Sequence, residues 1–508
     1  MSQSVEAGSM PMTLDEVVGY VHGRLVDVGH GHQPDRRSVR MRVVSDSRQA
    51  GADGLFVAIK GEHVDGHDYV PGLGARGCRA ALVDHLVPGA DLPQILVDDT
   101  VAALGLLARA NIDRRRKDSG PFTVIGITGS VGKTTTKDLL ASLLALLGSV
   151  VAPVGSFNNE IGLPLTALEV GPDTRYLVAE MGANHVGEIA SLTRMVPPDM
   201  ALVLKVGVAH LGEFGSVERI AQAKSEIVQG LVSGGTAVLN ADDSRVAAMA
   251  DLATGPVLRF GTAAEDGGRE RDLDGSARYL DSDGLDRPAF ELCLRGQQPV
   301  QLRLGIPGRH NVMNALAAAT VAHSLGLDAE RIADELRRQR RISPHRMAVS
   351  SVQLQDVSFT LIDDSFNANP DSVRAGLDAL AAWKKFDGPV YRIAVLGVML
   401  ELGDQGEQLH REIGAYCRRE GIDALVAVGC RDQQMDGLVQ ALVRGAGGPS
   451  DPNKDQSGAM RVLFAQDADQ ADRMVRQLCA RHSDRQDLVL LKGSHMSGLS
   501  DLADRWQG

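Results

Sequence analysis

The stretch that decides the fold is a glycine-rich turn between two regular segments, Thr128-Gly129-Ser130-Val131-Gly132-Lys133-Thr134-Thr135. Residues 122–127, just before it, form an apolar run of strand type, and a helical pattern begins at about Lys133. A strand that ends in such a turn and opens a helix directs several backbone N–H groups and the helix N-terminus at one point. The sequence therefore predicts an anion-binding loop at residues 128–135.

The residue types in this loop suit a nucleotide phosphate. Lys133 can place a cation on the β- and γ-phosphates, and the Thr134 hydroxyl can bind Mg²⁺. The standard spacing of such loops asks for a glycine five residues before Gly132, where this chain has Ile127. A glycine-rich turn without a ligand is the alternative, and the Gly-Lys-Thr-Thr run between a strand and a helix argues against it.

The length of 508 residues is too great for one hydrophobic core and predicts about three domains. We expect a smaller N-terminal α/β domain at 1–118, a central domain at 119–341 and a C-terminal Rossmann-like α/β domain at 342–508. The charged stretch 114–121 is suited to a linker, and Ser343-Pro344 marks the second boundary.

Strands and helices alternate along the last two domains, which is typical of α/β folds with helices on both faces of a mostly parallel sheet. The central domain is expected to contain a P-loop-type sheet, a small antiparallel excursion at 262–300 and a helix at 311–325. Residues 445–458 are rich in glycine and polar residues and predict a surface loop. The expected strands are 122–127, 176–180, 201–206, 237–240, 359–363, 393–396, 424–428, 462–464 and 488–491.

Composition and charge exclude several classes of protein. The net charge is −12, aromatic residues make up 4% and no long basic run occurs, so neither nucleic acid nor an anionic membrane is expected as a partner. Five widely spaced cysteines predict free thiols in a reducing compartment. The N-terminus resembles no signal peptide. The uncharged stretch 139–159 is interrupted by Gly148 and Pro153, which favours a buried helix and strand over membrane insertion. We expect a cytoplasmic monomer.

Two candidate metal ligands follow predicted strands at the sheet edge where ligands bind in open α/β folds. Glu180 ends the strand 176–180, and His210 follows the strand 201–206 by four residues. A carboxylate at this edge could hold Mg²⁺ against bound phosphates. A surface ion pair for Glu180 and a structural loop position for His210 are the alternatives.

Lys224 falls on the apolar stripe of a helix that starts near Val217, after a Ser216 N-cap. A lysine on a buried stripe is costly unless it is paired or chemically altered. A neutral amine can react with CO₂ to give a carbamate, which would convert this position into a metal-binding carboxylate. A lysine whose ammonium reaches solvent past the stripe is an equally open alternative.

Together these residues resemble the Mur ligase superfamily of three-domain, ATP-dependent, amide-forming enzymes. The resemblance extends from about residue 13 to about residue 500. It is carried by residues 128–135, Glu180, residues 209–211, Lys224 and residues 307–311, 343–346 and 363–365.

Within the superfamily, the chain is most similar to the ligases that add D-alanyl-D-alanine to UDP-N-acetylmuramoyl-tripeptide. This resemblance implies the last cytoplasmic step of UDP-muramoyl-pentapeptide synthesis for peptidoglycan. It also implies ATP, two Mg²⁺ ions and an acyl-phosphate intermediate. The stretches that carry it are 45–48 with 54–62, 157–166, 180–184 and, most specifically, Asp364-Ser365-Phe366-Asn367-Ala368-Asn369-Pro370-Asp371-Ser372.

The resemblance implies roles for individual residues. The loop at 128–135 would bind the ATP phosphates, with Asn311 on adenine and with Arg346 and Asp364 on phosphate and ribose. One Mg²⁺ would be held by Thr134 and Glu180, and a second by Glu180, His210 and a carbamylated Lys224. The implied catalytic residues are Lys133, Glu180, His210, Lys224 and Arg346. The implied substrate-binding residues are Ser45, Ser47 and Arg48 for the uridine nucleotide, Asn158 and Asn159 for the muramoyl peptide, and Asn367 and Asn369 for D-alanyl-D-alanine.

One position departs from the family pattern, because His495 stands where an arginine is expected after Lys492-Gly493-Ser494. Two other functions are weighed: a sister ligase that adds a single amino acid, and a nucleotide-binding regulatory module. Residues 367–370 argue against the first, and the joint presence of Lys133, Glu180, His210 and Lys224 argues against the second. The sequence does not distinguish diaminopimelate from lysine in the tripeptide.

Overall fold

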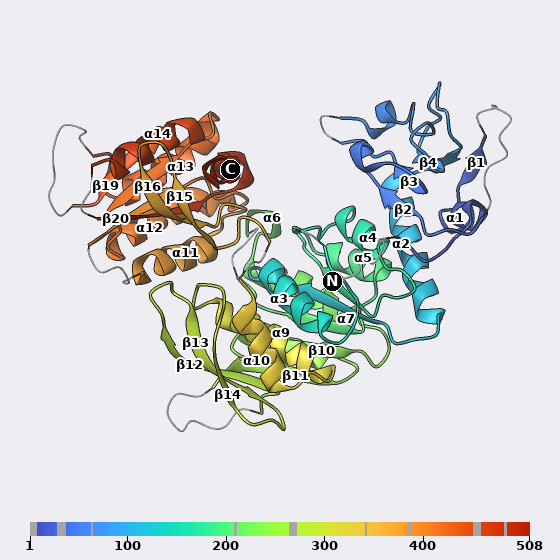
Figure 1. Ribbon diagram of the computed structural model, residues 1–508, viewed down its shortest axis with the longest axis horizontal. Helices are drawn as coiled ribbons and strands as arrows, with labels where there is room; N and C mark the ends of the chain where they lie inside the picture. Colours follow the sequence, from blue (N-terminus) through green and yellow to red (C-terminus); the bar gives the residue numbers. More distant parts are fainter. Residues whose placement is uncertain are drawn as a thin grey trace.

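The computed structural model describes residues 8–27, 37–61, 64–153, 155–207, 211–263, 272–340, 343–383, 389–450, 459–481 and 485–507. These residues form three lobes, each built on its own β-sheet (Figure 1). One sheet lies in each of the ranges 1–118, 119–341 and 342–508, as predicted. The α/β class is therefore confirmed, while the exact domain boundaries stay a prediction.

The first lobe has a sheet of order β1-β5-β4-β3-β2, in which only the edge strand β1 runs antiparallel to its neighbour. Strands β3 and β4 are buried on both faces, which explains why their sequences are continuously apolar. The elements are α1 (Leu14–Tyr20), β1 (Arg24–Val26), β2 (Arg42–Val44), η1 (Ser47–Gln49), β3 (Gly54–Val57), η2 (Gly66–Tyr69), β4 (Ala80–Val83), β5 (Gln94–Leu96) and α2 (Thr100–Lys117).

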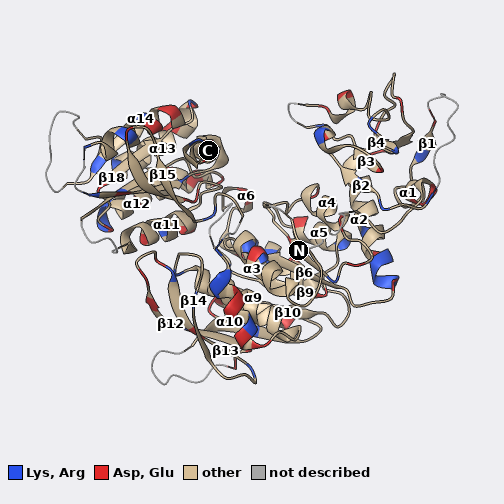
Figure 2. Ribbon diagram, viewed as in Figure 1, with Lys and Arg blue, Asp and Glu red and all other residues tan. Residues whose placement is uncertain are grey.

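The prediction of a linker at residues 114–121 is wrong for its first half, because α2 continues to Lys117. Basic residues at a helix C-terminus interact favourably with the helix dipole, and Figure 2 shows them at this end of α2. Each arginine also finds an acceptor on a different part of the fold. Arg114 Nη1 lies 2.7 Å from Glu16 Oε1, Arg115 Nε donates to the Thr174 carbonyl, and Arg116 Nη2 lies 3.0 Å from Asp199 Oδ2.

The central lobe has a sheet of order β14-β13-β12-β11-β10-β9-β6-β8-β7, parallel from β7 to β12 and antiparallel from β12 to β14. The predicted antiparallel excursion is confirmed over the described part of 262–300. The elements are β6 (Thr123–Thr128), α3 (Lys133–Ala145), β7 (Val150–Val151), α4 (Gly162–Ala167), β8 (Tyr176–Glu180), α5 (Glu188–Met195), β9 (Met200–Val203), α6 (Leu211–Phe214), α7 (Val217–Gln229), β10 (Thr236–Asn240), α8 (Ser244–Ala247), η3 (Ala248–Leu252), β11 (Val257–Thr262), β12 (Gly275–Ser282), β13 (Pro288–Leu294), β14 (Val300–Arg303), α9 (Asn311–Ser324) and α10 (Ala329–Arg338).

Alternate side chains of β6 enter different cores. Val124 belongs to an apolar cluster that includes α4, α5, α7 and α2 and continues into the first lobe. Ile125 and Ile127 belong to a second cluster formed with α3, α9 and α10 on the other face. Because α2 contributes to the core that the first two lobes share, it fixes the first lobe against the central one.

The third lobe has a sheet of order β15-β16-β20-β17-β18-β19, parallel except for β15, which pairs antiparallel with β16. Strand β15 was not expected from the sequence. The predicted loop at 445–458 lies partly outside the described residues. The elements are β15 (Ala348–Gln353), β16 (Ser358–Asp363), α11 (Pro370–Ala382), β17 (Val390–Leu396), η4 (Gly403–Gln405), α12 (Gly406–Arg419), β18 (Ala424–Val428), α13 (Gln433–Gly445), β19 (Arg461–Ala465), α14 (Ala468–Cys479), β20 (Gln486–Lys492), η5 (His495–Ser497) and α15 (Leu499–Gln507).

Candidate active site

The predicted phosphate loop joins β6 to α3 at the carboxyl edge of the central sheet. Gly132 is the N-cap of α3 and has a φ of 83°, in the left-handed region that favours glycine. A Cβ there would lie 2.3 Å from Asn314 Oδ1 on α9, so a larger residue would both strain the backbone and displace the Asn314 side chain. The loop therefore has the backbone that its glycines predict.

The loop forms one wall of a cavity of about 1030 Å³ between the central and third lobes. This is the size range of a site for a small ligand or cofactor. Residues 130–135 line it from the central lobe, and further lining residues come from α9 and from the start of the third lobe. The predicted site residues in its lining include Asn158, Asn159, Glu180, Asn311, Arg346, Asp364, Asn367 and Asn369.

Lys133 points along the phosphate loop, and its Nζ donates to the Gly129 carbonyl at 2.8 Å. The surrounding protein lowers the pKa of Lys133 by desolvating its ammonium, while the carboxylate of Glu180 opposes this shift. The ammonium has further N–H donors besides the one on Gly129. It can therefore contact a phosphate oxygen in the cavity.

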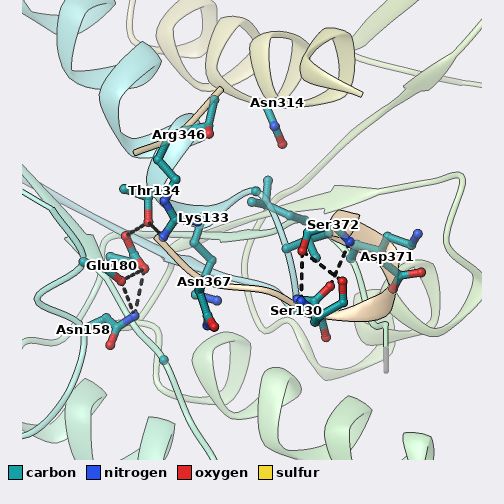
Figure 3. A pocket seen from close by; sticks show the side chains of 18 of the residues that line it. Ser130, Lys133, Thr134, Asn158, Glu180, Asn314, Arg346, Asn367, Asp371 and Ser372 are labelled. Carbon is teal, nitrogen blue, oxygen red and sulfur yellow. Dashed lines mark hydrogen bonds between the residues drawn. The ribbon is translucent and has the colours of Figure 1, made fainter. Parts of the chain in front are cut away.

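Glu180 is fully buried at the end of β8 and accepts hydrogen bonds from three neutral side chains. Figure 3 shows two of the donors, Thr134 and Asn158, beside it. Thr134 Oγ1 donates to Oε2 at 2.9 Å. Ser156 Oγ and Asn158 Nδ2 donate to Oε1 at 3.0 and 2.8 Å. The charge of Glu180 is therefore left for nearby cations to balance. A carboxylate beside a hydroxyl at the end of a phosphate loop is an oxygen donor set that fits Mg²⁺.

Arg346 brings a third-lobe cation to the phosphate loop. Its Nη2 donates to Thr134 Oγ1 at 3.3 Å, and its guanidinium lies 4.2 Å from the centre of the Phe366 ring. Stacking on the ring fixes the plane of the guanidinium without using its N–H groups. The buried Nε has no hydrogen-bond partner among the described residues, which leaves a donor for an anionic ligand.

Lys492, which the sequence left without a role, holds the segment 364–369. Its Nζ lies 2.6 Å from Asp364 Oδ2 and donates to the Asn367 carbonyl at 2.8 Å. Desolvation lowers the pKa of Lys492, and Asp364 opposes that shift. The buried pair fixes the backbone that presents Asn367 and Asn369 to the cavity.

Lys224 is buried in the middle of α7, with 2% of its surface exposed. Its ammonium lies 5.9 Å from the centre of the Phe214 ring. Burial lowers the pKa of Lys224 to about 7, and the charge of Lys133 adds to the shift. The alternative of a lysine that reaches solvent is therefore wrong. His210 lies outside the described residues, and Lys224 is not among the described residues that line the cavity.

The predicted uridine-binding residues lie apart from this cavity, in the first lobe. Ser45, Ser47 and Arg48 follow β2, where η1 begins. Arg48 is largely exposed and pairs with Asp46 at 2.8 Å, which lowers the pKa of Asp46 to about 2. Thr128 is also outside the lining, because its hydroxyl is buried against the Met181 carbonyl.

Three models of Mur ligase domains match consecutive parts of the chain. They are the Mur ligase family catalytic domain at residues 42–111, the Mur ligase middle domain at 127–322 and the Mur ligase glutamate ligase domain at 345–495. A Mycobacterium bovis protein named UDP-N-acetylmuramoyl-tripeptide--D-alanyl-D-alanine ligase is 39% identical, and the match covers 97% of each chain. The chain belongs to the Mur ligase family.

Solved Mur ligase structures match almost the whole chain. A crystal structure of MurF from Acinetobacter baumannii is 31% identical, with a TM-score of 0.79, and covers 99% of this chain and 100% of its own. A MurF ligase from Thermotoga maritima, in complex with ADP, is 27% identical, with a TM-score of 0.72, and covers 92% and 97%. The predicted family and three-domain α/β architecture are confirmed.

Several lining residues of this Mur ligase site were not predicted. Ser156 stands two residues before Asn158, and Asn314 stands one helical turn after Asn311, where its Nδ2 donates to Asn311 Oδ1 at 2.8 Å. Asn314 could have been found from its helical spacing to Asn311, and Ser156 from its place in the polar run that holds Asn158 and Asn159. Asp371 also lines the cavity and belongs to the stretch 364–372 that carries the resemblance, although no role was predicted for it. Lys205 lines the cavity too, and no local sequence signal distinguishes it.

Proposed function

We propose that this Mur ligase joins D-alanyl-D-alanine to UDP-N-acetylmuramoyl-tripeptide, with cleavage of ATP to ADP and phosphate. The observation that carries the proposal is one cavity in which the phosphate loop faces residues 364–369 of the third lobe. A carboxylate that is activated by phosphate transfer must meet its amine in the same enclosed space. The names of the M. bovis relative and of the ADP-bound T. maritima ligase support these substrates and this nucleotide.

In the first step, a carboxylate oxygen of the tripeptide attacks the γ-phosphorus of ATP. The new O–P bond forms while the bond to the bridging oxygen breaks, and ADP leaves. Catalysis of such a transfer consists mainly of positioning and of neutralising charge. Lys133 and Arg346 are two cations of the cavity lining that can donate to the phosphate oxygens.

The oxygen donors of Thr134 and Glu180 would hold one Mg²⁺, and Glu180, His210 and a carbamylated Lys224 would hold a second. When bound, these ions neutralise phosphate charge during the transfer. Thr134 and Glu180 are already 2.9 Å apart, so both oxygens can face one cation. Arg346, which donates to the same hydroxyl, would then turn its remaining donors to the phosphates.

The Lys224 carbamate depends on a neutral amine. With a pKa of about 7, about half of the Lys224 side chains are neutral at pH 7. For an ordinary lysine with a pKa near 10.4, the fraction is roughly 0.04%. Burial therefore raises the reactive fraction about a thousandfold, which supports a reaction with CO₂ at this position.

In the second step, the free amine of D-alanyl-D-alanine attacks the acyl carbon of the acyl phosphate. A C–N bond forms, the bond from carbon to the phosphate oxygen breaks, phosphate leaves and the amine loses a proton. Asn367 and Asn369 are the proposed contacts for the dipeptide. Because water also hydrolyses acyl phosphates, closure of the third lobe over the cavity would protect the intermediate.

The test is an amine panel with the purified full chain, ATP, Mg²⁺ and UDP-N-acetylmuramoyl-tripeptide. We expect phosphate release and a new amide product with D-alanyl-D-alanine, and neither with meso-diaminopimelate, lysine or D-alanine alone. Lys133→Ala is the matched inactive control, because it removes the phosphate-loop cation. Product formation only with a single amino acid would refute the proposal.

The remaining site assignments stay predictions. These are the uridine contacts of Ser45, Ser47 and Arg48, the peptide contacts of Asn158 and Asn159, and the adenine and ribose contacts of Asn311 and Asp364. The monomeric state and the cytoplasmic location also stay predictions. Among the described residues, no helix combines the length and apolar character that crossing a membrane requires.

A further inference from the structure

Lys137 is a buried lysine on α3, one helical turn after Lys133, and only 1% of it is exposed. A buried ammonium is costly unless each N–H finds an acceptor. The three donors of Lys137 meet three acceptors. Nζ lies 2.8 Å from Asp138 Oδ1, donates to the Gly155 carbonyl at 3.0 Å and donates to the Pro153 carbonyl.

Two of these acceptors belong to the segment that leads from β7 to α4 and supports Glu180. From this segment, Ser156 and Asn158 both donate to Glu180 Oε1. Phe157, between them, is 54% exposed, so it does not anchor the segment in a core. Besides these bonds to Glu180 and the backbone bond from Gly182 N to the Asn158 carbonyl, the donations from Lys137 fix the described part of this segment to α3.

The third acceptor connects the same helix to the third lobe. Asp138 Oδ1 pairs with Lys137, and its other oxygen, Oδ2, accepts from the Ser343 backbone N–H at 2.7 Å. Ser343 stands just before Arg346, which reaches Thr134. The Lys137–Asp138 pair thus lies between the segment that supports Glu180 and the start of the third lobe.

We propose that Lys137 is a positioning residue that holds Ser156 and Asn158 against Glu180, and so sets the carboxylate for the divalent cation. This inference rests on the proposed function, because the cation is the one that would accompany the nucleotide. Residues that orient a metal ligand through hydrogen bonds typically change metal affinity by about 10- to 100-fold when they are removed. Lys137 does not contact Glu180 itself. It binds the backbone of the segment whose Ser156 and Asn158 donate to Glu180.

The experiment compares Lys137→Met, which keeps an unbranched apolar chain but removes the ammonium, with Lys137→Arg, which keeps the charge. Lys117→Met, at the end of α2, is the control. Calorimetry measures ADP binding by the full chain with and without Mg²⁺, and hydrogen exchange follows residues 150–162. We expect Lys137→Met to bind ADP alone within about twofold of wild type, but to lose about 10-fold of the gain that Mg²⁺ provides. Residues 150–162 should exchange faster, and Lys137→Arg should recover part of both properties.

Wild-type Mg²⁺ dependence in Lys137→Met would overturn the inference, and so would an equal loss of ADP binding with and without Mg²⁺. If Lys137→Met fails to fold, Lys137→Gln carries the same test, because its shorter side chain and smaller number of N–H donors loosen the hold on the two carbonyls while a polar group still fills the site. The assay needs only ADP and Mg²⁺. Its result is therefore distinguishable from a failure of the amine panel, which tests the proposed reaction.

Discussion

At the residue scale, Glu180 and Lys224 are buried ionisable groups whose nearest contacts do not neutralise them. Glu180 receives hydrogen bonds from three neutral side chains, and Lys224 packs against the Phe214 ring. Charged groups further away act on both of them, Lys133 and Arg346 on Glu180 and the carboxylates of Glu188 and Glu226 on Lys224. Such clusters of buried charge are typical of functional sites. Both residues were chosen from sequence by their positions on a strand end and a helix stripe.

Glu180→Gln tests the charge without removing the side chain. The amide keeps the size of the carboxylate and one acceptor oxygen for Ser156 and Asn158, and the Thr134 hydroxyl can turn to accept from the new NH2 group, so the fold should persist. Turnover should fall by about 100-fold or more, since an electrostatic contact at the reacting charge is lost. Steady-state phosphate release over a Mg²⁺ titration checks this, with Glu330→Gln on the exposed face of α10 as control. Unchanged turnover of Glu180→Gln at low Mg²⁺ would contradict the proposal that Glu180 binds the metal ion.

The carbamate role of Lys224 predicts a loss that small carboxylates repair. Lys224→Ala should lose most activity, and added bicarbonate or acetate should restore part of it by supplying the missing oxygens. In the wild type, activation by bicarbonate should fall as the pH drops below about 7, because the amine is then protonated. Product formation over pH 6 to 9 with and without bicarbonate is the measurement. Full activity in Lys224→Ala would contradict the role.

The same residue predicts how stability depends on pH. The pKa of Lys224 is lowered from 10.5 to about 7 in the folded protein, so between these values the unfolded chain binds more protons. Stability should therefore rise with pH across this window, by on the order of 1 kcal/mol per unit. Without CO₂, Lys224→Met should stabilise the protein more at pH 6.5 than at pH 9, as measured by urea unfolding. An equal effect at both values would show that the pKa is not lowered.

At the element scale, the β6–loop–α3 unit combines a backbone requirement with a close contact. Gly132 needs a left-handed φ and leaves no room for a Cβ beside Asn314. The first requirement follows from the turn and was expected from the sequence. The second comes from α9, which lies more than 170 residues further along the chain.

Gly132→Ala should therefore damage the loop in two ways. The left-handed conformation costs roughly 1–2 kcal/mol for alanine, and the contact with Asn314 adds strain. We expect lower thermal stability and a loss of ADP affinity of about 10-fold. The control is Gly437→Ala in α13, where the Cβ meets open space and alanine should stabilise the helix by roughly 0.5–1 kcal/mol. Equal behaviour of the two variants would contradict the role of Gly132.

At the scale of the whole molecule, one of the contacts between the central and third lobes is a close approach of two glycines, Gly212 and Gly403. Gly212 in α6 donates its N–H to the Glu401 carbonyl at 2.9 Å, and a Cβ on Gly212 would lie 2.4 Å from Gly403 N. Helix α6 starts directly after His210 and leads to α7, which carries Lys224. The position of the third lobe is therefore linked through the backbone to the second proposed metal site.

In Gly212→Ala, the new Cβ should push the third lobe away from the central lobe at this contact, while the phosphate loop stays intact. ADP affinity should stay within about twofold of wild type, whereas turnover should fall by about 10-fold, because closure precedes chemistry. Small-angle X-ray scattering should show a larger radius of gyration with ADP and Mg²⁺ bound. Gly19→Ala, on an open face of α1, is the control. Normal turnover in Gly212→Ala would show that this contact does not limit closure.

The sequence by itself determined the alternation of strands and helices in the last two domains, the phosphate loop and the presence of Glu180 at a strand end, because periodicity and turn chemistry act between near neighbours. The tertiary structure decided what depends on distant partners. Residues 114–117 stay helical because their arginines find acceptors on both flanking lobes, and Lys492 has a role because Asp364 lies beside it. In the sequence, Lys137 likewise resembles any lysine of a helix. Only the structure shows that the carbonyls of Pro153 and Gly155 accept from its ammonium. Such partners are adjacent in space and remote along the chain, so no local pattern encodes their contacts.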